Sequence, residues 1–150
     1  MNVQNTKRRF IVDEWLWHDL GGENGLERQQ QAFRFLEQLV QKCDMLVSMK
    51  GSAFEQKFYN LCLFRDVRTP QIVRYCRNFV LNNSQKYLAI DQHDCPPLAE
   101  DWQIKPDDRY LARLATAGHG IVVTTDAPLM QELRVHQIEC IHRDELLDVY

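Results

Sequence analysis

Aspartates stand directly after two short apolar segments of this 150-residue sequence. Asp13 follows Phe10-Ile11-Val12, and Asp126 follows the segment from Ile121 to Thr125. Carboxylates brought to one point repel one another and lose hydration unless a cation shares the site. Mg²⁺ and Mn²⁺ prefer such oxygen ligands, and a bound ion can activate a water molecule for hydrolysis of a phosphate ester. These aspartates are therefore candidates for metal-assisted hydrolysis.

Further carboxylates stand in the first turns of two predicted helices. Glu55 follows the apolar segment Met45 to Met49 and Lys50-Gly51-Ser52, and Asp107-Asp108 open a helix predicted from Pro106 to Gly118. Each candidate has a local alternative, because a carboxylate in a first turn also stabilises the helix dipole. Asp126 precedes Ala127-Pro128 and could act as a helix N-cap, with proline in the first turn.

Five short apolar segments are predicted to be buried strands: Phe10 to Val12, Met45 to Met49, Tyr87 to Ile90, Ile121 to Thr125 and Ile138 to Ile141. Three-and-four spacing of apolar residues predicts helices around Phe33 to Cys43, Phe54 to Cys62, Thr69 to Val80 and Pro106 to Gly118. The segment Trp15-Leu16-Trp17-His18 is expected to pack on the sheet as an amphipathic element. Strands that alternate with helices indicate an α/β fold with a mostly parallel five-stranded sheet covered on both faces.

The sheet brings the acidic candidates to one edge. Ligands of such sheets gather at the carboxyl ends of the strands, where Asp13 and Asp126 both lie. The helix from Pro106 to Gly118 must run antiparallel to the strand at Ile121, so its first turn arrives beside the carboxyl end of that strand. Asp107 and Asp108 are therefore expected at the same edge. Asp108 is the better candidate, because Leu111, Ala112 and Ala115 follow it on the buried side of the helix.

Composition predicts one domain over residues 1–150, since the chain is 45% hydrophobic and 26% charged and has no linker-like segment. The net charge of −3 makes any nucleic-acid site a local feature. Five cysteines without a Cys-x-x-Cys pair argue against a disulfide framework or a structural zinc site. We expect a cytoplasmic protein without a membrane span, because no long apolar segment or secretory signal is present.

The order of these motifs resembles the PIN-domain family of metal-dependent nucleases, and within it the VapC-type toxin ribonucleases. The resemblance is carried by Phe10-Ile11-Val12-Asp13, by the segment from Val47 to Glu55, and by Asp108-x-x-Leu-Ala-x-x-Ala-x-x-Gly-x-Gly-Ile-Val-Val-Thr-Thr-Asp126. It implies a three-layer α/β/α sandwich around a parallel sheet with an acidic metal site. The chain departs from the family pattern at Glu14-Trp15, where a small hydroxyl residue and then Asn or Ser are usual.

The resemblance also implies roles for individual residues. The family's catalytic carboxylates fall on Asp13, Glu55, Asp108 and Asp126. Asp13, Asp108 and Asp126 would bind Mg²⁺ or Mn²⁺, with Glu55 acting directly or through water. Thr124 matches the family's hydroxyl residue before the last aspartate, and Asp107 is a supporting candidate. The implied activity is endoribonucleolytic hydrolysis of RNA, and a toxin of this kind would have a cognate antitoxin and form a homodimer.

Arginines at positions 65, 68, 74 and 77 form a second candidate site. Arg65, Arg68, Arg74 and Arg77 surround the start of the helix predicted from Thr69 and could bind RNA phosphates. The alternative is a solvated helix face.

Two other functions fit part of the sequence. A PIN-like module could bind RNA or protein without cleaving it, which the unusual Glu14-Trp15 allows. A phosphoacceptor receiver domain would use Asp13 and Glu14 as its acidic pair and Asp91 as its phosphoacceptor. The receiver is disfavoured because it requires a lysine after its last strand, and the last lysine of this chain is Lys105.

Overall fold

The computed structural model describes residues 7–63 and 69–150. These residues contain one five-stranded sheet in which every neighbouring pair of strands is parallel. The strands are β1 (Arg9–Val12), β2 (Met45–Met49), β3 (Tyr87–Ile90), β4 (Ile121–Thr124) and β5 (Cys140–His142). Their order across the sheet is β3-β2-β1-β4-β5. The predicted α/β class and the number of strands are confirmed for the described residues, with small shifts at the ends of β1, β4 and β5.

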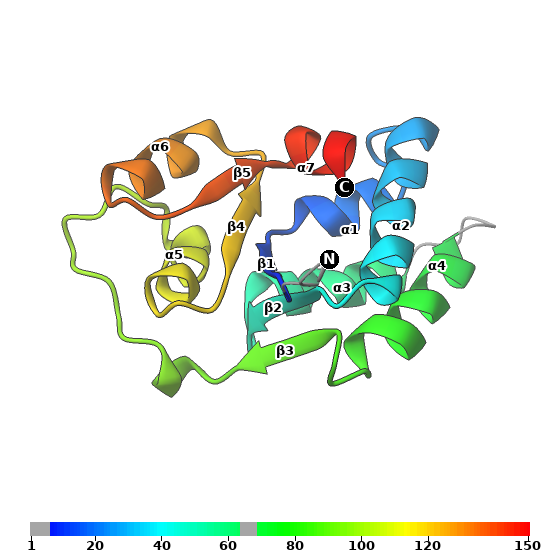
Figure 1. Cartoon of the computed structure of the whole chain (residues 1–150), viewed down its shortest axis with the longest axis horizontal. Coiled ribbons are helices and arrows are strands. Elements are labelled where there is room, and N and C mark those ends of the chain that lie inside the picture. The colour runs from blue at the N-terminus through cyan, green and yellow to red at the C-terminus, as the bar shows by residue number, and fades with distance from the viewer. Residues whose placement is uncertain (1–6, 64–68) are drawn as a thin grey trace, which may run out of the picture.

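Helices flank both faces of the sheet. They are α1 (Trp15–Leu20), α2 (Leu26–Gln41), α3 (Ala53–Leu61), α4 (Thr69–Tyr75), α5 (Arg109–Thr116), α6 (Ala127–Val135) and α7 (Arg143–Val149). Figure 1 shows α5 and α6 on one side of the sheet and α1, α2, α4 and α7 on the other. This layering is consistent with a three-layer sandwich. No helix in residues 7–63 or 69–150 is long and apolar enough to cross a membrane.

Two predicted helices change their winding along their length. The helix that begins at Thr69 continues beyond α4 as a π-helical segment, η1 (Cys76–Leu81). The helix that begins at Pro106 opens with a 3₁₀ turn, η3 (Pro106–Asp108), before α5. A second 3₁₀ turn, η2 (Gln92–Asp94), follows β3. Helix α6 begins at the Asp126 side-chain cap, in agreement with the N-cap alternative for this residue, whereas α7, which begins at a cap on His142, was not predicted.

Helix α1 holds the segment after β1 against the sheet. Trp15 and Trp17 are both 4% exposed. The indole nitrogen of Trp15 donates to the carbonyl of Val123 at 2.9 Å, and that of Trp17 donates to the carbonyl of Phe54 at 2.7 Å. Because both indole N–H groups are satisfied, the two large rings can be buried without leaving an unpaired donor. The Trp15-to-His18 segment therefore packs as predicted.

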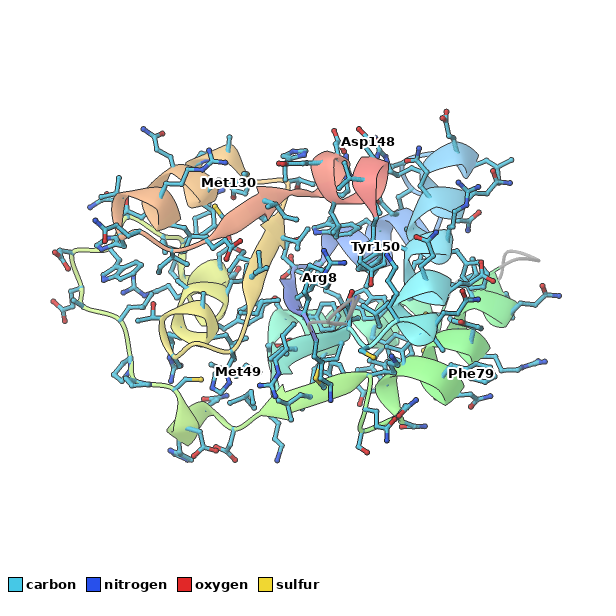
Figure 2. The ribbon with its side chains drawn as sticks, in the orientation of Figure 1. Arg8, Met49, Phe79, Met130, Asp148 and Tyr150 are labelled. Carbon is cyan, nitrogen blue, oxygen red and sulfur yellow. The ribbon has the colours of Figure 1, made fainter. Side chains whose placement is uncertain are left out.

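A buried carboxylate joins the start of β1 to the end of the sequence. Asp44, which is 3% exposed, accepts hydrogen bonds from the Arg8 amide at 2.9 Å and from the Tyr150 hydroxyl at 2.6 Å. The Arg8 guanidinium also lies over the Tyr150 ring, and Figure 2 shows the two side chains next to each other. Burial alone would raise the pKa of Asp44, but the bonds from Tyr150 and Arg8 hold that pKa below its ordinary value. This contact anchors β1 at its amino end, opposite the acidic residues.

Gly120 permits the close approach of β4 to β1. A Cβ atom added at this position would lie 2.6 Å from the carbonyl oxygen of Arg9. The neighbour is backbone and cannot rotate away, so any side chain would push β4 from β1. Gly118 differs, because its φ of 82° favours glycine but no atom lies within 4 Å of its added Cβ.

We therefore predict that Gly120→Ala lowers the free energy of unfolding by about 3 kcal/mol or more, since overpacking is relieved only by moving backbone. Gly118→Ala is the control and should cost about 1–2 kcal/mol, the usual penalty of a left-handed backbone. Urea denaturation measures both. Equal losses in the two variants would contradict the close approach of β4 to β1.

Candidate functional site

A cavity of about 520 Å³ opens at the carboxyl edge of the sheet. Residues that follow three adjacent strands contribute to its wall: Asp13 after β1, Asp126 after β4 and Arg143 after β5. Parallel strands end at a common edge, so residues far apart in the sequence meet there. Glu14 from the start of α1, Asp108 from the start of α5 and Glu23 from the turn after α1 add further carboxylates to the wall.

Thr124 connects Asp13 and Asp126, the aspartates that follow β1 and β4. Its hydroxyl donates to Oδ2 of Asp13 and accepts a hydrogen bond from the Asp126 amide at 3.1 Å. Thr124 is 0% exposed, and both bonds are part-buried. The other oxygen of Asp13 accepts from the Trp15 amide at 2.9 Å. Together these contacts orient the Asp13 carboxylate.

Asp126 has a local role as well as its place in the cavity. Its Oδ1 accepts from the Leu129 amide at 3.1 Å, which caps α6, with Pro128 in the first turn. The N-cap interpretation of Asp126 is therefore correct, and it is compatible with a place in the cavity wall.

The two aspartates before α5 lie in different surroundings. Asp108 is half-buried and lines the cavity, whereas Asp107 is exposed and is not part of its wall. Among residues 7–63 and 69–150, no hydrogen-bond donor contacts the Asp108 carboxylate, which does not cap α5. Its charge is thus available inside the cavity.

Burial and mutual repulsion raise the pKa values of this cluster. Burial raises the pKa of Asp13 from its ordinary value of 3.8 to about 6, against the lowering effect of its bonds from Thr124 and Trp15. Asp108 and Asp126 add to the rise by charge repulsion. Burial also raises the pKa of Asp108, assisted by Asp126, and that of Glu14, assisted by Asp13 and Asp108. Ionisation of Asp13, Glu14 and Asp108 is therefore opposed by burial and by the charges of neighbouring carboxylates.

Glu14 is a cavity residue that the sequence analysis did not select. In the sequence, Glu14 stands out as a departure from the family pattern and as half of the acidic pair of a receiver domain. The signal that could have identified it is its position directly after Asp13, at the turn that leads into α1.

Glu55 does not join the acidic cluster. Its carboxylate accepts from the Gly51 amide at 2.8 Å and from the Tyr87 hydroxyl at 2.6 Å. It lines a separate cavity of about 290 Å³ with Trp17, Phe58 and Tyr87. The orientation of α3 about its axis explains this placement. Phe54 is buried at 1% exposure, and with Phe54 facing the core the next residue, Glu55, faces Tyr87. The prediction that Glu55 reaches the acidic edge is not met by this geometry.

The arginine series lies elsewhere on the molecule. Arg74 and Arg77 are exposed on α4 and η1, and neither lines the acidic cavity. Arg77 lines the cavity of Glu55, and its guanidinium lies 3.5 Å from the sulfur of Cys62. Arg65 and Arg68 lie outside the described residues.

Asp91 also lies apart from Asp13. It follows β3, which is an edge strand separated from β1 by β2, and its side chain caps η2 by accepting from the His93 amide at 3.0 Å. The acidic pair and the phosphoacceptor of a receiver domain are therefore not brought together.

Further polar and charged residues from α1, from the turn after it and from the start of α7 also line the cavity. His18 and Glu23 contact each other through Nδ1 and a carboxylate oxygen, and both line the cavity. Arg143 pairs with Asp19, Nη1 to Oδ1, at 3.3 Å. Within the described ranges, no three His, Cys, Asp or Glu side chains stand close enough together to hold a metal ion as placed. The acidic residues share one cavity without converging on a single point.

Comparisons of the chain with models of protein families, with curated proteins and with solved structures found no match.

The raised pKa of Asp13 predicts a pH-dependent effect of Asp13→Asn on stability. A carboxyl whose pKa is higher in the folded protein favours folding when protonated, so its ionisation lowers the free energy of unfolding as pH rises through the interval from 3.8 to about 6. Asp13→Asn removes this loss. In EDTA, the variant should gain stability over the wild type as the pH rises from about 4 to about 7, by on the order of 1–3 kcal/mol.

Urea denaturation at a series of pH values measures that difference. Asp107→Asn is the matched control, since Asp107 is exposed outside the cavity, and its difference from the wild type should stay nearly constant. A pH-independent difference for Asp13→Asn would contradict the electrostatics of the cluster.

Proposed function

We propose that this protein is a metal-dependent endoribonuclease of PIN-like fold, which hydrolyses RNA phosphodiester bonds at the acidic cavity. The observation that carries the proposal is the meeting of Asp13, Glu14, Asp108 and Asp126 from three separate segments in one cavity. The parallel sheet supports the PIN-like assignment, because the family resemblance implies such a sheet with acidic residues at its edge.

The donor set fits a hard divalent cation. Its members offer carboxylate oxygens, the ligands that Mg²⁺ and Mn²⁺ prefer. Among the described residues, none of Asp13, Glu14, Asp108 and Asp126 forms an ion pair with Lys, Arg or His. Asp13, Asp108 and Asp126 would hold the ion. Glu14 would take the role that the family resemblance implies for Glu55, acting on the ion directly or through water. Small side-chain rotations would be needed, since no three of these groups are close enough as placed.

When bound, Mg²⁺ or Mn²⁺ supplies an activated water molecule and offsets negative charge on the phosphodiester. The chain contributes orientation. Thr124 holds Asp13 and the Asp126 backbone in one arrangement, and the cap on α6 holds the Asp126 side chain. Residues held by such bonds need little reorganisation during a reaction.

The resemblance to VapC-type toxins adds partners to the proposal. A cognate antitoxin and a homodimer would follow from it, and light scattering on the purified chain tests the dimer.

Divalent cations should stabilise the folded protein, because they bind the native cluster and relieve its repulsion. At ~100-fold excess over Kd, we predict a gain of about 2.7 kcal/mol in the free energy of unfolding. Thermal melting in EDTA and in Mn²⁺ measures the gain. Asp108→Asn should lose it, and Asp107→Asn should retain it. Equal melting temperatures of the wild type in EDTA and Mn²⁺ would contradict the metal site.

Asp126→Asn should abolish RNA cleavage while preserving the fold. Asparagine can still accept the Leu129 amide hydrogen bond, so the cap on α6 remains and only the charge is lost. Loss of one metal ligand should lower the rate on the order of a hundredfold or more. The assay is cleavage of total RNA and of transfer-RNA substrates in Mg²⁺ or Mn²⁺, with circular dichroism as the folding check.

Asp107→Asn is the control and should keep nearly full activity. If the wild type binds RNA but never cleaves it, the protein is instead a non-catalytic binding module. Equal cleavage by the wild type and Asp126→Asn would place the activity at another site or in a contaminant.

A further inference from the structure

We propose that Arg143 binds a phosphate group of the RNA substrate in the acidic cavity. This inference rests on the proposed ribonuclease function, and it assigns a positioning role to a residue that neither the motifs nor the family resemblance selected.

The placement of Arg143 comes from the sheet. Thr124 of β4 pairs with His142 of β5, so Arg143 leaves the sheet one strand away from Asp126. Arg143 is the one Lys or Arg among the described residues that line the cavity. Its side chain is 16% exposed and lines the cavity.

A fully buried carboxylate holds this guanidinium in place. Nη1 of Arg143 lies 3.3 and 3.4 Å from the two oxygens of Asp19, which is 0% exposed. Asp19 also accepts from the Asn24 side chain at 2.6 Å. The Nε atom of Arg143 donates to Asp144 at 3.0 Å. In residues 7–63 and 69–150, Nη2 of Arg143 has no hydrogen-bond partner and remains available as a donor.

An orientation fixed in this way suits phosphate recognition. The planar guanidinium matches the oxygens of a phosphate, and little side-chain freedom is lost when two of its nitrogens are already bound. A polynucleotide that approaches the cavity meets five carboxylates, those of Asp13, Glu14, Glu23, Asp108 and Asp126, which repel its phosphates. Arg143 supplies the attraction of the one Lys or Arg among the described lining residues, and would orient the backbone relative to Asp13 and Asp126.

Arg28 provides a matched control. It pairs with Asp144 at 3.2 Å and thus belongs to the same chain of ion pairs, but it does not line the cavity. Arg28→Gln weakens the ion-pair chain without removing a cavity cation. A purely structural role of Arg143 would make both arginine variants behave alike.

The test measures binding without cleavage. A fluorescein-labelled single-stranded RNA of mixed sequence is titrated with protein in EDTA, and fluorescence anisotropy gives Kd at several salt concentrations. The variants are Arg143→Lys and the double variant Asp19→Asn/Arg143→Gln, which does not leave the Asp19 charge buried and unpaired. Circular dichroism checks the folding of each.

The double variant should bind RNA about tenfold more weakly, and the slope of log Kd against log salt concentration should fall by about 0.7, the value for one phosphate contact on a single strand. Arg143→Lys keeps the charge, so it should retain the slope and bind with intermediate affinity. Arg28→Gln should match the wild type in slope.

Unchanged affinity and slope in the folded double variant would overturn the inference. The titration is repeated with Ca²⁺ in place of EDTA, and a wild type that binds RNA in neither condition would also overturn it. A wild type that binds RNA through Arg143 but never cleaves it would contradict the proposed function while leaving the phosphate site intact. If the wild type cleaves RNA and the double variant cleaves it with the same KM, the phosphate site alone would be contradicted.

Discussion

Parallel backbone pairing between β1 and β4 determines where the acidic side chains lie. The pairing places Val12 opposite Val123, so Asp13 and Thr124 continue side by side from adjacent strands. The Thr124 hydroxyl then binds the Asp13 carboxylate and the Asp126 amide together. Gly120 makes this pairing possible, because the Arg9 carbonyl occupies the space that a side chain would need. A shift of β4 would separate Asp13 from Asp126 and open the cavity.

The same arrangement stores electrostatic repulsion at the cavity. Burial raises the pKa of Asp13 to about 6, and the neighbouring carboxylates act in the same direction. Beside the cluster, both indole nitrogens of α1 are bonded to backbone carbonyls, whereas the buried hydroxyl of Tyr110 has no hydrogen-bond partner among the described residues. A bound cation would relieve this repulsion. The repulsion among the carboxylates would therefore both destabilise the empty site and favour the binding of the cation that the proposed function requires.

The carboxylates and the arginine of the cavity come from different elements of the fold. The carboxylates come from the ends of β1 and β4 and from the start of α5, whereas Arg143 follows β5 and is held by the buried Asp19 of α1. On the proposed function, Asp13, Asp108 and Asp126 hold a cation and Arg143 holds the phosphate. Glu55 takes part in neither, because its carboxylate satisfies Gly51 and Tyr87 in a separate cavity.

The sequence by itself determined the strands, because each short, continuously apolar segment is typical of a strand buried on both faces. It also determined that Asp13 and Asp126 share an edge, since parallel strands end together, and that Asp108 rather than Asp107 faces inward, since Leu111 and Ala112 set the buried side of α5. Only the tertiary structure decided the strand order, the exclusion of Glu55 and the inclusion of Glu14 and Arg143. Periodicity indicates which side of an element is buried but not its neighbours: α3 is rotated by the packing of Phe54, and Asp19 meets Arg143 across 124 positions of sequence.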